Sequence, residues 1–236
     1  MRLALLRVML TTWMLVAIGE AAIGGPFEDA NDAFKRGDYA TALGLLRPLA
    51  EQGLAKAQYA LGAMYDHGWG VAQNYADALK WYRLAADQDD VLAQNSLGIM
   101  YRGGNGVGQD YAEALKWFRK AADQGSVVAQ NNLGEMYLNG HGMRQDYAEA
   151  LKWFRKAADR GLAVAQNNLG LMYAQGQGVP QDYVQAHMWF NVAASQGGPV
   201  SRRSVRAREA IASVMTPAQI AEAQKLAREW KPKPER

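Results

Sequence analysis

The chain has 236 residues, of which 49% are hydrophobic and 21% charged, a globular balance that excludes a disordered protein. It contains no cysteine, which excludes disulfides, thiolate metal sites and a cysteine nucleophile. The net charge of +3 is unevenly spread, because residues 27–198 carry 15 basic and 18 acidic side chains whereas residues 199–236 carry 9 and 4, so the main body has no basic stripe for nucleic acid.

The N-terminus has the pattern of an export signal. Arg2 and Arg7 precede an apolar stretch from Val8 to Ile18. Small residues follow as two possible cleavage-site pairs, Gly19 with Ala21 or Ala22 with Gly24. The alternative is an uncleaved N-terminal membrane anchor, but a spanning helix needs about 20 apolar residues and this run is shorter. We therefore predict a cleaved signal peptide over residues 1–24 and a periplasmic or secreted bacterial location.

From residue 54 to residue 197 the sequence repeats every 36 residues, which predicts four repeats. The aligned columns are Tyr39, Tyr75, Tyr111, Tyr147 and Tyr183; Gly62, Gly98, Gly134 and Gly170; and Trp81, Trp117, Trp153 and Trp189. Residues 25–53 are predicted to form a degenerate first helix pair that caps the array. Residues 198–230 are predicted to be closing helices, with a frayed tail at 231–236.

Each repeat is predicted to hold two helices, as the third repeat illustrates. Its first helix runs over 127–138 and ends at the glycine-rich loop after Asn139, where glycine can adopt a left-handed conformation. Its second helix begins after the N-cap Asp146, and Glu149 is placed to complete a capping box. Gly134 lies inside the first helix at a cost of about 1 kcal/mol relative to alanine. Its recurrence in every repeat predicts a close approach of two helices.

The closing segment contains a helix break at Thr216 and Pro217, which are predicted to be the N-cap and first residue of the last helix. Basic residues cluster before this break at Arg202, Arg203, Arg206 and Arg208. Apart from the N-terminal signal, this basic segment is the one predicted place for membrane contact. A solvated helix face is the alternative interpretation.

Several motifs of the third repeat resemble those of the Sel-one-like repeat family, a relative of the tetratricopeptide repeat. These motifs are Ala129-Gln130-Asn131-Asn132-Leu133-Gly134, Met136-Tyr137, the Gly-x-Gly loop, the series Asp146, Tyr147, Ala150 and Trp153, and Lys156-Ala157-Ala158. The resemblance implies an all-α fold, a right-handed α-solenoid of antiparallel helix pairs. It also implies a scaffold that brings proteins together or holds a peptide. Some cysteine-rich relatives are β-lactamase-like, and the absence of cysteine keeps that activity from being carried over.

No group of residues predicts catalysis, a metal site or a cofactor. His67, His141 and His187 do not share a position in the repeat, and no H-E-x-x-H pair accompanies them. No serine lies in a G-x-S-x-G elbow. We therefore predict that the chain is not an enzyme.

Two surfaces are candidates for partner binding. The first is the concave side that the first helices line in tetratricopeptide-like solenoids, with candidates Asn95, Asn131, Asn167, Asp66 and Arg102. Its amides are suited either to an extended peptide or to bonds between repeats, and the sequence leaves both open. The second is a variable loop position between two glycines, occupied by Trp69, Asn105, His141 and Gln177, which predicts a display point.

The resulting functional hypothesis is an exported scaffold that binds a protein or peptide of unknown identity, without nucleic acid. A peptidoglycan- or glycan-binding envelope protein is the alternative, motivated by Trp69 and by the tryptophan column. For that column, packing between repeats is the competing interpretation. A hydrolase with an unrecognised site is the third hypothesis.

Overall fold

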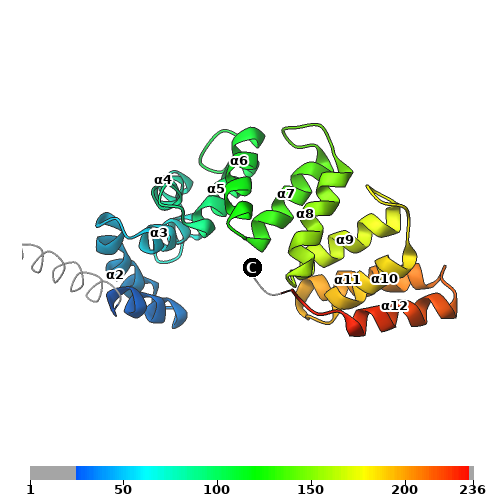
Figure 1. The fold of residues 1–236 in the computed structure, drawn as a ribbon. Coiled ribbons are helices and arrows are strands. Elements are labelled where there is room, and N and C mark those ends of the chain that lie inside the picture. Colours follow the sequence, from blue (N-terminus) through cyan, green and yellow to red (C-terminus); the bar gives the residue numbers. More distant parts are fainter. Residues whose placement is uncertain (1–24, 234–236) are drawn as a thin grey trace, which may run out of the picture. The chain divides into compact units, whose positions relative to one another are not determined.

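The computed structural model describes residues 25–233, so the predicted signal peptide lies outside the described residues. Within this range the regular structure is entirely helical (Figure 1). The chain divides into two units, one ending at Gln109 and one beginning at Asp110, which are described separately below. The all-α fold built from repeated helix pairs, predicted from the 36-residue period, is confirmed.

Unit 1 begins with a helix over residues 25–35. The helices that follow are α2 (Tyr39–Glu51), α3 (Ala55–His67), α4 (Tyr75–Ala86) and α5 (Val91–Gly103). Consecutive helices pack on each other, α2 on α3, α3 on α4 and α4 on α5. A helix pair therefore precedes the first repeat, over the segment predicted to be a degenerate cap.

Unit 2 contains the helices α6 (Tyr111–Asp123), α7 (Val127–Asn139), α8 (Tyr147–Asp159), α9 (Ala163–Gln175), α10 (Tyr183–Ala194), α11 (Gly198–Ala212) and α12 (Pro217–Glu229). Each helix from α6 to α10 packs on the next, and α12 packs on α10. The largest fully buried side chains are one leucine, one methionine and one aromatic ring per repeat, which in the third repeat are Leu133, Met136 and Phe154.

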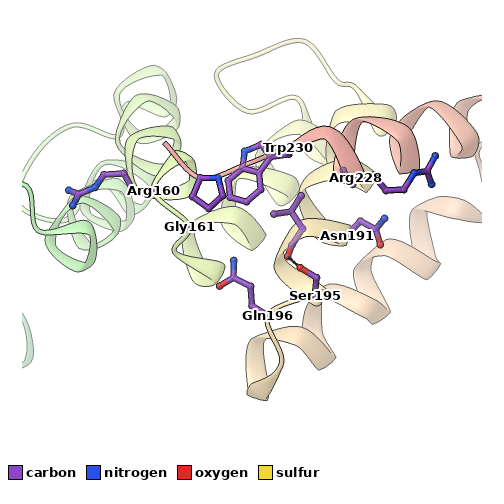
Figure 2. A pocket seen from close by; sticks show the side chains of 10 residues that line it. Arg160, Gly161, Asn191, Ser195, Gln196, Arg228 and Trp230 are labelled. Carbon is purple, nitrogen blue, oxygen red and sulfur yellow. Dashed lines mark hydrogen bonds between the residues drawn. The ribbon is translucent and has the colours of Figure 1, made fainter. Parts of the chain in front are cut away.

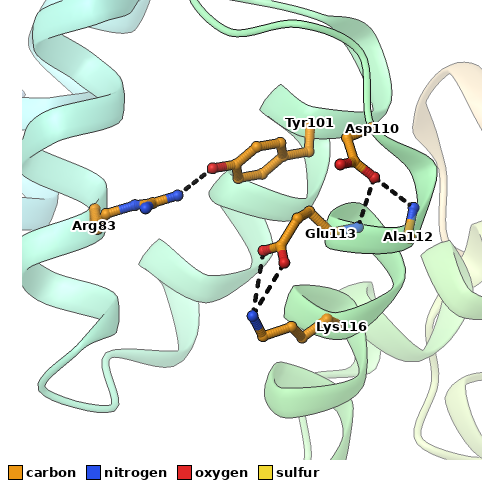
Figure 3. A network of polar contacts seen from close by, with 6 residues as sticks. All are labelled: Arg83, Tyr101, Asp110, Ala112, Glu113 and Lys116. Atoms are coloured by element: carbon orange, nitrogen blue, oxygen red, sulfur yellow. Dashed lines mark hydrogen bonds and ion pairs between the residues drawn. The ribbon is translucent and has the colours of Figure 1, made fainter.

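The second helix of each repeat begins at the predicted cap. The carboxylate of Asp110 accepts hydrogen bonds from the backbone N–H groups of Ala112 and Glu113 at 2.9 and 3.0 Å (Figure 3). The predicted return bond of the capping box, from the N-cap backbone N–H to the glutamate carboxylate, is not formed. Instead Glu113 pairs with Lys116 at 3.1 Å, and Glu149 pairs in the same way with Lys152. A complete capping box is found at the break before α12, where Thr216 and Gln219 bond each other's backbone N–H groups.

Arginine–tyrosine hydrogen bonds join each second helix to the next first helix within a unit. In unit 1 the guanidinium of Arg83 donates to the hydroxyl of Tyr101 (Figure 3). In unit 2 Arg119 donates to Tyr137 at 2.5 Å, and Arg155 donates to Tyr173. Donor and acceptor are 18 residues apart in every case, which is half a repeat. The same bond therefore links a second helix to the following first helix each time.

The glycine-rich loops close tightly on the preceding repeat. Gly140 ends α7 in the predicted left-handed conformation, with φ of 67°. Gly142, with φ of 73°, lies so close to the previous second helix that an added Cβ would be 2.7 Å from the Cβ of Tyr111. The loop is thus part of the packing between repeats.

The tail predicted to fray from residue 231 is bound to the end of α8 through Lys233. The backbone N–H of Lys233 donates to the carbonyl of Asp159 at 2.7 Å, and its ammonium group lies 2.5 Å from the carboxylate of the same residue. The ring of Trp230 lies edge-on to Trp189 with centroids 5.9 Å apart. This half-buried ring packs where the chain turns back toward the turn between α8 and α9, and residues 234–236 of the predicted tail lie outside the described residues.

Candidate protein-interaction surface

The glutamines of the first helices are structural. The buried Gln166 side chain donates to the carbonyl of Ala158 at 3.2 Å, at the end of the preceding second helix. Gln58, Gln94 and Gln130 form the same bond, each donating to the carbonyl of the alanine eight residues before it. Each glutamine therefore satisfies a carbonyl that the helix end leaves without an intrahelical partner.

The asparagines of unit 2 form a ladder between neighbouring repeats. Asn168 donates to the side-chain oxygen of Asn131 at 3.1 Å, and Asn131 donates to Glu135 at 2.9 Å. Between α11 and α9, the hydroxyl of Ser204 donates to the side-chain oxygen of Asn167 at 2.9 Å. Asn131 is 5% exposed. The geometry thus favours bonds between repeats, one of the two interpretations left open by the sequence, and makes Asn131 a poor contact for a partner.

Aliphatic side chains are exposed beside this ladder. In unit 2 Val128 lies three residues before Asn131, and Val164 and Leu171 lie three before and four after Asn167, so they share a helix face with the amides. Their exposed fractions are 46%, 36% and 37%. We call Val128, Val164 and Leu171, with the amides between them, the first-helix surface of unit 2. Sequence reasoning missed these residues, although one column of the repeat is aliphatic at Leu92, Val128, Val164 and Val200.

The corresponding surface of unit 1 carries the remaining predicted contacts. Asp66, Asn95 and Arg102 are all half-buried. The Asp66 carboxylate accepts a hydrogen bond from the hydroxyl of Tyr82 at 3.2 Å. Burial, followed by the Asp66 charge, raises the pKa of Tyr82 above its ordinary value and keeps the hydroxyl protonated. The two aliphatic residues Leu92 and Ile99 are exposed on the same face of α5.

The predicted loop display is revised for two of its four residues. Trp69 is half-buried against the core of unit 1, where its ring meets Phe34 edge-on at 5.0 Å and stacks on Tyr39 at 6.3 Å. His141 stacks on Tyr111 with centroids 4.7 Å apart. The loop bends back over the preceding second helix, so these rings pack inward. Asn105 and Gln177 are also half-buried.

Three of the four tryptophans of the column are buried, as packing between repeats predicted, and Trp81 is half-buried. Trp117, Trp153 and Trp189 are buried, with at most 7% of each side chain exposed. Lysine ammonium groups lie over two of the rings, with Lys156 Nζ 4.1 Å from the Trp153 centroid. These three rings therefore offer no platform for stacking a sugar.

A hollow of about 680 Å³ lies in unit 2 between the α8–α9 turn, α10 and the segment after α12 (Figure 2). The guanidinium groups of Arg160 and Arg228 extend in opposite directions from it. Its amides are already engaged, since Asn191 accepts from Arg208 at 2.7 Å and Gln196 donates to Gln166 at 2.8 Å. The lining contains no carboxylate or imidazole group, so the hollow lacks the acid–base pair of a hydrolase site. Arg208, one of the four clustered arginines, has a structural partner here.

The described residues contain no group of three or more potential metal ligands of the His, Cys, Asp or Glu type. His187 is buried in α10, His67 is the last residue of α3, and His141 lies in the loop after α7; the last two each lie against an aromatic ring. Across residues 25–233, none of the helices has the length and apolar character needed to cross a membrane.

The family profile of the Sel1 repeat matches four consecutive segments of the chain, residues 55–90, 91–126, 127–162 and 163–198. These segments differ by one residue from the four repeats predicted from the sequence, and together they make up more than half of the chain. No curated protein matches.

Solved structures show the same relationship. A protective antigen of uropathogenic Escherichia coli strains with an SLR fold is 34% identical over 93% of this chain and 48% of that chain, with a TM-score of 0.72. A Sel1 repeat protein from Oxalobacter formigenes is 40% identical over 71% of this chain and 49% of that chain, with a TM-score of 0.62. The chain thus spans about half the length of these two proteins. An immunity protein of Pseudomonas aeruginosa, 22% identical over 85% of this chain and 81% of that chain with a TM-score of 0.53, shares the fold alone.

Proposed function

Because this chain belongs to the Sel1 repeat family, we propose that it is an exported scaffold that binds a protein or peptide through its first helices. Sel1 repeat proteins act as scaffolds for protein–protein interaction and are in general non-catalytic. For this chain we propose in addition that binding occurs at the first helices, that the protein is exported and that it is not an enzyme.

The observation that carries the proposal is the first-helix surface of unit 2. Val128, Val164 and Leu171 are exposed in register on a face whose amides already bond one another. A rigid apolar stripe of this kind gains free energy when a partner covers it, at roughly 25 cal/mol per Å² of apolar area buried.

The experiment is a crosslinked pull-down from envelope extracts of the source cells. The baits are the wild-type protein, the Val164→Glu/Leu171→Glu variant and the control Val214→Glu, which places one such charge on an exposed residue between α11 and α12. We expect one dominant protein with the wild type and the control, and at least about tenfold less with the double variant, since a buried unpaired charge is strongly unfavourable. Equal recovery with all three baits contradicts binding at this surface.

The glycan-binding alternative is tested with the same proteins. Retention on purified peptidoglycan that is lost in Trp69→Ala, together with no captured protein, would favour that alternative. The half-buried position of Trp69 among Phe34 and Tyr39 supports a structural role for the ring instead. Turnover of ester, amide or glycoside substrates by the purified protein would contradict the non-catalytic part of the proposal.

The exported location rests on Arg2, Arg7 and the apolar stretch from Val8 to Ile18. The Escherichia coli neighbour is a protective antigen, which agrees with this location. Cell fractionation combined with the intact mass of the isolated protein is the test. We expect the protein in the periplasm or medium, shortened by about 24 residues according to the predicted cleavage region. Full-length protein in the membrane fraction would indicate the N-terminal anchor instead.

A further inference from the structure

A second cavity, of about 220 Å³, opens within unit 1 between the helix over 25–35, α2 and α3. Three aromatic rings and one leucine line it, together with two alanines and a single amide. These residues are Phe34, Tyr59, Trp69, Leu46, Ala60, Ala63 and Asn31. A small apolar cavity with one or two polar groups at its edge has the chemistry of a side-chain pocket.

The cavity arises because the first repeat departs from the other three at the positions that line it. Ala63 occupies the position of Ile99, Glu135 and Leu171. Ala60 occupies the position of Ser96, Asn132 and Asn168. Tyr59 stands where the other repeats have Asn95, Asn131 and Asn167. Small residues remove volume from the surface of α3 while an aromatic ring adds a wall, so the hollow is lined by residues that the other three repeats do not carry at these positions.

The walls of the cavity are held in place by neighbouring rings. Trp69 contacts Phe34 edge-on at 5.0 Å and His67 at 4.4 Å, while Tyr59 lies 5.7 Å from Tyr82. A cavity of about 150 Å³ is enough to hold benzene, and pockets for drug-sized ligands begin at about 300 Å³. The size of this pocket therefore suits one large side chain better than a small-molecule ligand.

Negative charge lies beside one wall of the pocket, because Asp66 accepts a hydrogen bond from the hydroxyl of Tyr82, whose ring centroid is 5.7 Å from that of Tyr59. Burial raises the pKa of Tyr59, and the negative charges of Asp90 and Asp66 raise it further. Asp66 lies seven residues after Tyr59 on the same face of α3, and both it and Asp90 are half-buried. A basic residue of a partner, placed next to the inserted side chain, would meet this negative charge.

We propose that this pocket is the anchor site for the protein partner and takes one large apolar side chain, aromatic or aliphatic, from a segment with Lys or Arg next to it. The inference rests on the proposed function, because it assumes a protein partner. It adds the position of the anchor and the chemistry of the segment that is bound.

The test uses blocked dipeptides as probes and the indole N–H signals of the ¹⁵N-labelled protein as the readout. The probes are N-acetyl amides of Phe-Lys, Leu-Lys, Phe-Glu and Gly-Lys. We expect Phe-Lys and Leu-Lys to shift the Trp69 signal saturably while the signal of Trp189 in unit 2 stays unchanged. Trp69→Phe identifies the signal. Phe-Lys should bind about two- to fivefold more tightly than Phe-Glu, the range of an exposed ion pair, and Asp66→Asn should reduce that preference, with the charge of Asp90 left in place.

Filling the pocket is the critical variant. Ala63→Leu introduces the residue that the fourth repeat carries at Leu171, so the helix tolerates it, and it should abolish the Trp69 shift. Ala60→Asn introduces the residue that the same repeat carries at Asn168 and provides a second way to fill the pocket. Ala76→Leu, at an exposed position of α4, is the matched control and should bind like the wild type.

The proposal is overturned if Phe-Lys causes no shift, if Gly-Lys causes the same shift, or if the filled variants bind as the wild type does. An equal affinity for Phe-Lys and Phe-Glu overturns the assignment of a basic neighbour. The pull-down separates this inference from the proposed function. A partner retained by Ala63→Leu but lost in Val164→Glu/Leu171→Glu refutes the anchor alone, whereas dipeptide binding without any captured protein refutes the scaffold function.

Discussion

Gly134 in α7 lies directly against the ring of Phe154 in α8, so that an added Cβ would be 2.6 Å from two of the ring carbons. Gly62 faces Tyr82 and Gly170 faces Phe190 in the same way, each at 2.7 Å. The close approach predicted from the glycine column is therefore confirmed. Glycine weakens the helix by about 1 kcal/mol, and in return a large ring of the second helix is completely buried.

Gly134→Ala should destabilise the protein. The new methyl group must displace the Phe154 ring, and overpacking of this kind costs about 1–3 kcal/mol, which exceeds the gain of up to about 1 kcal/mol in helix propensity. Urea unfolding followed by tryptophan fluorescence measures the change. The matched control is Gly44→Ala in α2, where an added Cβ has no neighbour within 4 Å, and there we expect a gain of about 0.5–1 kcal/mol. Destabilisation of both variants to the same extent would contradict the role of the ring.

The hydrogen bond between Asn168 and Asn131 should appear as a coupling in the free energy of unfolding. A double-mutant cycle with Asn131→Ala and Asn168→Ala should give about 0.5–1.5 kcal/mol, the usual net contribution of one hydrogen bond. The control cycle pairs Asn168→Ala with Asn139→Ala, an exposed residue that bonds its own helix. Its coupling should stay within about 0.5 kcal/mol. Equal coupling energies in both cycles would show that the hydrogen bond between Asn168 and Asn131 is not a specific link between repeats.

His187 should make the stability of the protein depend on pH. Burial, followed by the positive charge of Arg208, lowers the pKa of this imidazole below its ordinary value of 6.5. Between the folded-state pKa and about 6.5 the unfolded chain therefore binds the proton more readily, so the free energy of unfolding falls as the pH falls, by at most about 1.4 kcal/mol per pH unit.

The test compares urea unfolding of the wild type and His187→Leu from about pH 5 to about pH 7.5, a window that spans the ordinary histidine pKa. Leucine is the residue that the other repeats carry at this position, as Leu79, Leu115 and Leu151. The variant should lose the part of the pH dependence that His187 causes and should gain stability relative to the wild type as the pH is lowered. Parallel pH profiles would show that the buried imidazole does not contribute.

The C-terminal segment should be held by Trp230 more than by its ion pair. Trp230→Ala removes the ring that packs on Trp189, and loss of a partly buried aromatic side chain should cost about 1–3 kcal/mol. Lys233→Ala should cost at most about 1 kcal/mol, because its ammonium group is largely exposed. Limited proteolysis at the C-terminus and thermal unfolding measure both variants. A larger effect of Lys233→Ala would reverse this order.

Local features of the fold were predictable from the sequence because they depend on residues close together in the chain. The caps at Asp110 and Asp146 and the left-handed Gly140 follow from helix ends, which need a side-chain acceptor at one terminus and freedom of φ at the other. The capping box at Glu149 failed because Lys152, one turn further on, competes for the same carboxylate. The burial of Trp117, Trp153 and Trp189 agrees with their position in the repeat, whereas Trp81 in the same column is half-buried.

The sequence by itself determined the period of 36 residues, the two helices of each repeat and the family, since each is written in short motifs that recur. Only the tertiary structure decided how those motifs are used. Asn168 and Asn131 are 37 residues apart, and Lys233 and Asp159 are 74 apart. Whether such side chains bond each other, turn inward as Trp69 does or leave a cavity as Ala63 does depends on the volume and polarity of neighbours far away in the chain, which a local pattern does not contain.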